Sequence, residues 1–308
     1  MITLAMIKLN GNQIIGNTEQ PGSESIIKSV NPKTGQTIDP EYKGANKSQV
    51  NEACMLAKNA FDAYRKTSLS KRAEFLEVIA REIENLGEQL INKFIEESGL
   101  PEARAKGETG RTVGQLRMFA GYIKKGFASN ATIDSALLDR KPLPRTDHRL
   151  TNVPLGPVVV FGASNFPLAF SVAGGDTASA LAAGCPVIVK GHSAHLGTSE
   201  LVGKAIINAI KKCNMPNGTF SLLFGSGSIV GQELVANKEI KGIGFTGSRK
   251  GGLAILKTAQ SRKEPIPVYA EMSSINPVFL LPSVFDNPTS IVDGFVGSLT
   301  MGAGQFCT

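Results

Sequence analysis

Short apolar runs alternate with helical stretches over the second half of the chain. The apolar runs predict buried strands over residues 158–162, 186–190, 220–224, 241–245 and 267–271. Helices are predicted between and after them, over residues 166–183, 198–212, 228–236 and 249–260. Buried strands that alternate with helices are typical of a doubly wound parallel sheet. The pattern therefore predicts an α/β protein.

The first half of the chain follows a helical pattern instead. Residues 1–45 are polar and rich in turn signals, and we expect a short hairpin and loops there. Ser48 and Ser70 are the expected caps of two amphipathic helices. Their apolar positions recur in steps of three and four: Val50, Cys54, Ala57, Phe61 and Tyr64, then Phe75, Leu76, Ile79, Ile83, Leu86 and Leu90. This spacing makes Cys54 a small buried core residue.

Two further segments complete the outline. A third helix is predicted from Glu108 to Lys124, after the breaker at residues 99–101. Residues 130–155 contain prolines and polar alternation rather than helical spacing. That composition predicts an extended segment that leaves the main body and serves in a subunit contact.

Composition narrows the classes of function. Of 308 residues, 42% are hydrophobic and 19% charged, which is typical of a globular protein with a sizeable core. Neither a signal peptide nor an apolar run of the roughly 18 residues that a membrane helix needs is present, so we expect a cytoplasmic protein without membrane contact. The net charge of +7 is spread out and aromatic residues make up only 6%, so nucleic-acid binding is not expected.

The cysteines and histidines do not form a metal-binding pattern. The chain has four Cys and three His, and no CxxC pair. We therefore expect no zinc site and no disulfide scaffold. Scattered cysteines fit a reducing compartment.

Polar residues follow the predicted strands, at the edge where parallel sheets bind ligands. Asn165 offers an amide donor after the first strand, although for this residue alone a turn or cap is the better explanation. Lys190 ends the second strand and can meet a ribose or a phosphate. No acidic residue follows it before Glu200, so a 2′-phosphate would not be repelled there.

The loops after the second, third and fourth strands extend this edge. His192 and Ser193 follow Lys190, and His192 is either a ligand-facing side chain or an ordinary loop histidine. Glycines after the third strand permit a close approach of a pyrophosphate, or simply a tight turn. The candidate residues in these two later loops are Gly227, Gly231, Phe245, Thr246, Gly247 and Ser248.

Two residues near the end of the sequence suggest chemistry. Glu271 ends the fifth strand, where a carboxylate is unusual; it suits a general base, or a salt bridge. Cys307 lies on a glycine-rich turn and is a candidate nucleophile. No Cys–His motif is visible, so dipoles, a neighbouring cation or a positively charged cofactor ring would have to activate its thiol.

In combination these segments resemble the aldehyde dehydrogenase superfamily over essentially the whole chain. The motifs are PLGPVVVFGASNFPLAF (154–170), the strand-end Lys190, GFTGS (244–248), EMSSINP (271–277) and GQFCT (304–308). The resemblance implies a Rossmann-like domain that binds NADP or NAD. It further implies that Cys307 is the nucleophile, that Asn165 and the Cys307 N–H hold the oxyanion, and that Glu271 activates water. Lys190 would bind the adenine ribose, and Gly227, Gly231 and Ser248 would neighbour the pyrophosphate.

Within the superfamily the sequence is most similar to α-ketoglutaric semialdehyde (2,5-dioxovalerate) dehydrogenases. Residues 165–195 and 111–116 carry this likeness, and NADP-preferring long-chain aldehyde dehydrogenases are the nearest competitor. The usual Glu-Leu-Gly-Gly reads Glu-Met-Ser-Ser at 271–274. The resemblance places Arg111, Phe166 and Phe170 at the substrate, with Arg111 binding a distal carboxylate or else pairing with Glu108.

The resemblance also implies a domain plan. Residues 1–129 and 153–274 would form the cofactor-binding domain, 130–152 an oligomerisation segment, and 275–308 a truncated start of the catalytic domain. We therefore expect a fragment of a homodimeric or homotetrameric enzyme, with unpacked apolar surface over residues 278–308. The alternative is a non-catalytic nucleotide-binding module. We expect NADP to bind at least as well as NAD.

Overall fold

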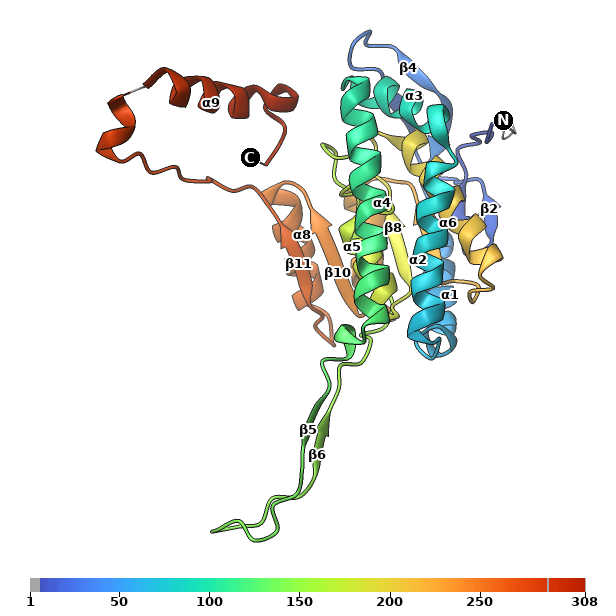
Figure 1. Cartoon of the computed structure of the whole chain (residues 1–308). Helices are drawn as coiled ribbons and strands as arrows, with labels where there is room; N and C mark the ends of the chain where they lie inside the picture. Colours follow the sequence, from blue (N-terminus) through green and yellow to red (C-terminus); the bar gives the residue numbers. More distant parts are fainter. Residues whose placement is uncertain (1–5, 287, 308) are drawn as a thin grey trace.

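The computed structural model describes residues 6–286 and 288–307, so Thr308 and the first five residues lie outside the described part. Figure 1 shows a layered body from which a long hairpin and a C-terminal arm project. The strands are β1 (Gln13–Ile15), β2 (Thr18–Gln20), β3 (Ile26–Val30), β4 (Thr37–Lys43), β5 (Thr132–Asp134), β6 (His148–Leu150), β7 (Val158–Phe161), β8 (Val187–Lys190), β9 (Phe220–Leu223), β10 (Gly242–Thr246) and β11 (Val268–Glu271).

The helices account for most of the remaining body. They are α1 (Lys47–Tyr64), α2 (Leu69–Glu84), α3 (Gly87–Ser98), α4 (Glu102–Lys124), α5 (Gly175–Ala183), α6 (Leu196–Lys212), α7 (Gln232–Ala236), α8 (Arg249–Gln260) and α9 (Pro288–Thr300). Short 3-10 helices lie at Phe127–Ser129 and Pro282–Asp286, and a π-helical turn at Gly227–Gly231. Met301–Gly304 is a tight turn in which Gly302 and Ala303 have positive φ.

The main sheet confirms the predicted α/β class. Its strand order within the described residues is β11-β10-β7-β8-β9-β1-β2, and β7 to β11 pair in parallel. The N-terminal hairpin β1–β2 adds two antiparallel strands beside β9, an extension that the sequence pattern did not reveal. β1 has only three residues, and its adjacent residues Ile14 and Ile15 are both buried. So short an apolar run does not reveal a strand by its periodicity.

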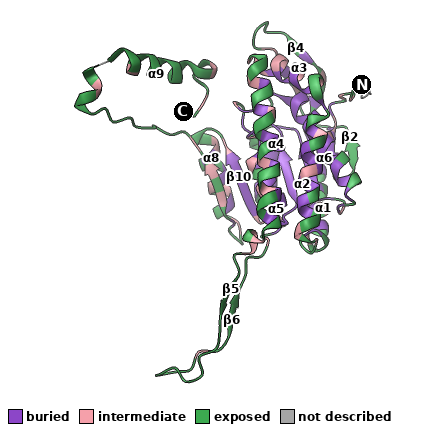
Figure 2. Ribbon diagram, viewed as in Figure 1, coloured by how far each residue is buried: buried purple, intermediate pink, exposed green. Residues whose placement is uncertain are grey.

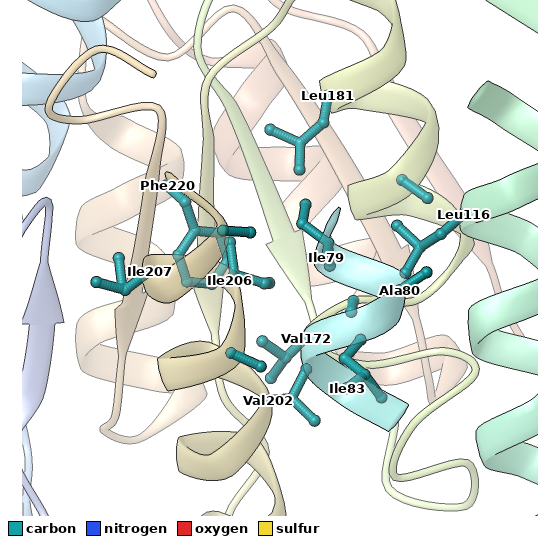
Figure 3. Packing of buried hydrophobic residues seen from close by; sticks show 14 of the residues in the cluster. Ile79, Ala80, Ile83, Leu116, Val172, Leu181, Val202, Ile206, Ile207 and Phe220 are labelled. Atoms are coloured by element: carbon teal, nitrogen blue, oxygen red, sulfur yellow. The ribbon is translucent and has the colours of Figure 1, made fainter. Parts of the chain in front are cut away.

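Two cores cover the two faces of this sheet. Val160 and Val189 pack into a cluster with α2, α4, α5 and α6, part of which Figure 3 shows. Val159 and Ile188 point the other way, into a cluster with α1, α7 and α8. Successive strand residues face opposite sides, so a strand covered on both sides is apolar at every position. Figure 2 shows the resulting buried centre.

The helix boundaries differ from the prediction in several places. Asn46, not Ser48, caps α1, because its side chain accepts from the Gln49 N–H while Gln49 accepts from the Asn46 N–H in return. Ser68, not Ser70, caps α2. The predicted second helix is split in two: α2 ends at Glu84, and α3 begins at Gly87, whose φ is +51°.

Two predicted helical spans have the wrong length. The third helix, α4, begins at Glu102, six residues before the predicted start. Residues 166–174 form turns instead of helix, so α5 covers only the end of the predicted span. The loop is tight: a side chain at Gly174 would meet the Ala169 carbonyl oxygen at 2.4 Å.

Two segments project from the body. Strands β5 and β6 form an antiparallel hairpin with every residue exposed, as expected for an extended excursion. The C-terminal arm, defined here as residues 275–286 and 288–307, buries no residue that the structure describes. Its exposed apolar side chains include Phe279 at 88% and Phe295 at 61%. Figure 2 shows the arm as almost wholly exposed.

Candidate functional site

The carboxyl ends of the parallel strands meet at one edge, and the candidate residues follow those ends. The register pairs Phe161 with Lys190 across β7 and β8, and Thr246 with Glu271 across β10 and β11. Asn165 lies in the loop after β7. The sheet therefore gathers at one edge side chains that are far apart in the sequence.

The loop after β7 also contacts the turn that carries Cys307. The Asn165 Nδ2 donates a hydrogen bond of 2.7 Å to the Gln305 carbonyl oxygen. Nearby, Asn276 Nδ2 donates to the Cys307 carbonyl oxygen at 2.5 Å. Asn165 and Asn276 thus both hold the cysteine turn, and sequence reasoning missed Asn276.

Cys307 lines an open cavity of about 470 Å³. Its wall includes Asn165, Met272, Asn276 and Phe306. Cys307 is exposed, while the other three cysteines, Cys54, Cys185 and Cys213, are buried. Desolvation raises the pKa of the Cys54 thiol to about 12, which fits its predicted role as a core residue. Cys307 is therefore the one accessible thiol of the four cysteines.

Glu271 precedes Met272, which lines this cavity, but is not itself one of the lining residues. Its side chain is exposed, and within the described residues no hydrogen bond or ion pair engages its carboxylate. Only its backbone is held, because the Gly247 N–H donates to the Glu271 carbonyl oxygen at 3.0 Å. Among the described residues Glu271 therefore forms no salt bridge, and its carboxylate is exposed to solvent.

Lys190 is buried at the end of β8. Its ammonium donates to the carbonyl oxygen of Gly225, just after the neighbouring strand β9, at 3.4 Å. Burial lowers its pKa from the usual 10.5 to about 8. A lysine in this environment carries its charge at neutral pH and loses it at moderately alkaline pH.

His192 follows Lys190 and is half-buried. Burial, with smaller contributions from His195 and Lys190, lowers its pKa to about 3. The ring is therefore uncharged at neutral pH and would not attract a phosphate by charge. Its Nδ1 accepts the Ala194 N–H at 3.1 Å, as in an ordinary loop histidine. Ser193 is exposed in the same loop.

The loops after β9 and β10 each begin a helix at this edge. Ser226 caps the π-helical turn by accepting the Ile229 N–H, and Ser248 caps α8 by accepting the Gly251 N–H. Sequence reasoning missed Ser226, although a serine before a helix start was the available signal.

The two candidate glycines of the loop after β9 differ in their surroundings. At Gly227 a side chain would meet nothing within 4 Å, so the backbone is open to a ligand. At Gly231 a side chain would meet Phe161 at 2.9 Å, which makes that glycine a packing requirement.

Phe245 and Thr246 end β10, and Gly247 begins the loop that follows it. The Phe245 ring packs against Phe161 at a centroid distance of 5.9 Å. A side chain at Gly247 would meet the Phe245 ring at 2.8 Å. Thr246 is half-buried beside β11. Gly247 is therefore also required for packing, because a side chain there would overlap the Phe245 ring.

A cluster of aromatic rings and guanidinium groups lies beside the Asn165 loop. Phe166 contacts both Phe170 and Phe306, with ring centroids 4.9 and 4.8 Å apart. The Arg111 guanidinium lies 4.8 Å from the Phe170 centroid and 5.7 Å from that of Phe166. Arg111 is exposed, and its charge therefore needs no buried partner.

The alternative pairing of Arg111 with Glu108 does not occur among the described residues. Glu108 is buried and pairs instead with Arg104, whose Nε lies 3.2 Å from its carboxylate. Sequence reasoning missed Arg104. Its spacing of four from Glu108 on one helix was the available signal.

Comparison with known proteins identifies the family. The model of the aldehyde dehydrogenase family matches residues 18–308, and the chain belongs to that family. It is 57% identical over 98% of its length to alpha-ketoglutaric semialdehyde dehydrogenase 2 of Azospirillum brasilense. It is 47% identical, again over 98% of its length, to the alpha-ketoglutaric semialdehyde dehydrogenase of Acinetobacter baylyi. The chain spans 58% and 57% of these two relatives.

A solved structure confirms the fold. An aldehyde dehydrogenase C variant of Pseudomonas syringae, complexed with NAD+ and octanal, matches with a TM-score of 0.83. The match covers 96% of this chain and 57% of that one, at 22% identity. No helix that the structure describes is long and apolar enough to cross a membrane. The described residues contain no group of three or more His, Cys, Asp or Glu that could hold a metal ion.

Proposed function

We propose that this chain carries the nucleophile and the cofactor-binding residues of an enzyme that oxidises 2,5-dioxopentanoate to 2-oxoglutarate with a nicotinamide dinucleotide. The observation that carries the proposal is the hydrogen bond from the Asn165 side chain to the turn before Cys307. Asn165 and the accessible thiol of Cys307 also line the same cavity. The identities of 57% and 47% to two semialdehyde dehydrogenases support the substrate.

The chain's own residues would divide the reaction as follows. The Cys307 thiolate adds to the aldehyde carbon, and the Asn165 amide with the Cys307 N–H stabilises the resulting oxyanion. Loss of hydride from that carbon leaves a thioester on Cys307. Glu271 takes a proton from the water that attacks the thioester, which releases the carboxylic acid and the free thiol. The exposed carboxylate of Glu271 is free to take this role.

The strand-end loops fit a dinucleotide cofactor. When bound, a nicotinamide dinucleotide supplies the acceptor for the hydride. Lys190 and Ser193 would face its adenine ribose, with His192 beside them as a neutral hydrogen-bonding group. The open backbone at Gly227 and the N-terminus of α8 at Ser248 would face the pyrophosphate. No acidic residue follows Lys190 before Glu200, which favours NADP at least as much as NAD.

Arg111, Phe166 and Phe170 would bind the rest of the substrate. The Arg111 guanidinium is exposed over two rings and has no ion pair among the described residues. It is therefore free to bind the carboxylate of a keto acid. The aromatic surface itself would suit a second candidate, a medium- or long-chain fatty aldehyde. Phe166, Phe170 and Phe306 form that surface.

The projecting segments fit a homodimer or homotetramer. We assign residues 130–152, with the exposed hairpin β5–β6, to subunit contact. Residues 1–129 and 153–274 form the cofactor-binding part in this proposal, and residues from 275 onward belong to the catalytic part. The exposed apolar side chains of the C-terminal arm are consistent with that assignment.

The proposal is tested by following reduced-cofactor absorbance with NADP+ or NAD+ and an aldehyde. We expect 2,5-dioxopentanoate to give a higher kcat/KM than octanal. A preference for octanal would favour the fatty-aldehyde candidate. Binding of NADP+ or NAD+ in a titration without any reduction would identify a nucleotide-binding module instead.

Arg111→Ala tests the carboxylate contact within the same assay. We expect kcat/KM for 2,5-dioxopentanoate to fall by roughly 10- to 100-fold, because a charge-assisted contact is lost. Propanal, which has no carboxylate, should be affected by less than about twofold. An equal fall for both substrates would remove Arg111 from carboxylate recognition.

A further inference from the structure

Glu108 provides a buried anchor for the loop that carries Asn165. Its carboxylate is fully buried in α4, and one oxygen accepts the backbone N–H groups of Leu168 and Ala169 at 2.9 and 3.1 Å. A buried carboxylate is tolerated only when hydrogen bonds compensate it. These two bonds fix the loop that carries Asn165 against α4. They also satisfy much of the Glu108 charge.

Arg104 uses only a part of its guanidinium on this anchor. Its Nε donates to the second Glu108 oxygen at 3.2 Å, and no other hydrogen bond of the group occurs within the described residues. The two terminal nitrogens keep the forked geometry that matches a carboxylate. The side chain is 28% exposed, so this fork is reachable from solvent.

The Arg104 guanidinium packs on the aromatic ring of the residue that precedes Cys307. The guanidinium carbon lies 4.3 Å from the ring centroid of Phe306, the residue before Cys307. It also lies 4.6 Å from the centroid of Phe166, a ring that Arg111 contacts as well. Residues seven apart lie on the same face of a helix. Arg104 and Arg111 thus share one aromatic ring, and the structure brings Arg104 to the Phe306 ring in addition.

We propose that Arg104 is a substrate-recognising residue, whose terminal guanidinium nitrogens bind the carboxylate of the aldehyde acid whose carbonyl group meets Cys307. Arg111 reaches the same carboxylate or its 2-oxo group across Phe166. The inference rests on the proposed function, because it names the group that selects the substrate. A neutral aldehyde gains nothing from this contact, so the two arginines separate acidic from neutral aldehydes.

The test compares two alkylating reagents of similar size at Cys307. Iodoacetate carries a carboxylate and iodoacetamide does not, and the ratio of their rates cancels the fraction of reactive thiolate. The other three cysteines are buried, and mass spectrometry of the Cys307 peptide reports the modified site. This readout needs no turnover of the enzyme. We expect Arg104→Ala to lower the iodoacetate-to-iodoacetamide ratio by roughly fivefold, because a positive charge that attracts the anion is removed.

Matched variants define the result. Arg104→Lys keeps the charge and should keep most of the ratio. Arg104→Gln removes the charge but retains a donor for Glu108, and it replaces the alanine variant if that variant fails to fold. Lys106→Ala removes an exposed cation of α4 that pairs with Glu102, and should leave the ratio unchanged. A ratio unchanged by Arg104→Gln, or lowered equally by Lys106→Ala, would overturn the proposal.

Kinetics separate this inference from the proposed function. With turnover, Arg104→Gln should raise KM for 2,5-dioxopentanoate and leave KM for propanal unchanged. An unaltered KM for both substrates also counts against Arg104. If neither cofactor is reduced by any aldehyde, the proposed function fails, while the alkylation ratio still decides whether Arg104 attracts a carboxylate to Cys307.

Discussion

The sheet and the C-terminal arm belong to one chain but differ in whether their apolar residues are buried. In β8 and β9 every residue is buried, and alternate positions belong to the two cores. In the arm, α9 is also rich in apolar residues, yet none of its described residues is buried. An apolar pattern therefore does not by itself make a core, because a core also needs a second surface to pack against. The proposed cofactor site lies on the first region, and the proposed nucleophile on the second.

This comparison predicts that a substitution in the arm can abolish activity while the fold and the cofactor affinity of the body are kept. Cys307→Ser should lower aldehyde-dependent cofactor reduction by about 10⁴-fold or more, because the hydroxyl is a far weaker nucleophile. The midpoint of thermal unfolding and the Kd for the cofactor should not change. A large fall in cofactor affinity would show that the two regions are not separable in this way.

Matched phenylalanines measure the packing difference directly. Phe220→Ala, in the buried strand β9 and labelled in Figure 3, should cost about 3–5 kcal/mol of the free energy of unfolding. Phe285→Ala removes a side chain that is 58% exposed in the arm. It should cost less than about 0.5 kcal/mol. Denaturant titration gives both values. Similar costs would mean that the arm is packed in solution.

Asn165 joins the two regions and sharpens the contrast between them. Asn165→Ala removes the hydrogen bond to Gln305 and the proposed oxyanion donor. We expect kcat to fall by about 10²- to 10³-fold with little change in KM. Asn165→Asp keeps the size but offers no amide donor, and should not rescue kcat. A normal kcat for Asn165→Ala would show that the hydrogen bond to Gln305 is only structural.

The smallest expected effect is a pH dependence on the sheet side. Burial lowers the pKa of Lys190 to about 8, so its charge is present below that pH and is lost above it. The affinity for NADP+ should therefore weaken as pH rises through about 8, and more than the affinity for NAD+. In the unfolded chain Lys190 keeps its proton to higher pH, so this residue makes the fold more stable as pH rises from 8 toward 10.5.

Calorimetric titrations of both cofactors at several pH values check this prediction. Lys190→Met should flatten the pH dependence for NADP+, because it removes the titrating group but keeps an unbranched side chain at the buried end of β8. Lys106→Ala, which removes an exposed lysine of α4, is the control and should keep the pH dependence of the wild type. If NADP+ binding by the wild type were flat across this range, Lys190 would have no part in phosphate recognition.

The sheet could be predicted from the sequence more closely than the ends of the helices. Its parallel strands β7 to β11 fall within one residue of their predicted bounds. For β7 to β10 the reason is that strands covered on both faces are continuous apolar runs. β11 lies at the edge of the sheet and is partly exposed, so the prediction of a buried strand there was wrong. The start of α2 was misplaced because Ser68 and Ser70 are equal candidates for its cap until the path of the chain is known. The short strands β1 and β2 join the sheet because β1 pairs with β9, and no local pattern encodes that contact.

The site was predicted as residue types rather than as contacts. Strand ends located Asn165, Lys190 and Glu271, because parallel strands bring their carboxyl ends together. The pairing of Glu108 with Arg104 instead of Arg111 depends on how the loop at Leu168 folds against α4. A sequence contains both spacings and does not choose between them.

The double covering of the central strands has a consequence for how their alignment is enforced. In a sheet with one solvent-exposed face, a shift in register by one residue moves the apolar side chains into solvent, which is energetically costly. In β7, a slip that exchanged Val159 with Val160 would still leave apolar side chains on both faces. Polarity within these strands therefore cannot select their register. Side-chain shape and the polar residues at the strand ends, such as Lys190, must select it, so a residue assigned to ligand binding would also keep the strands in alignment.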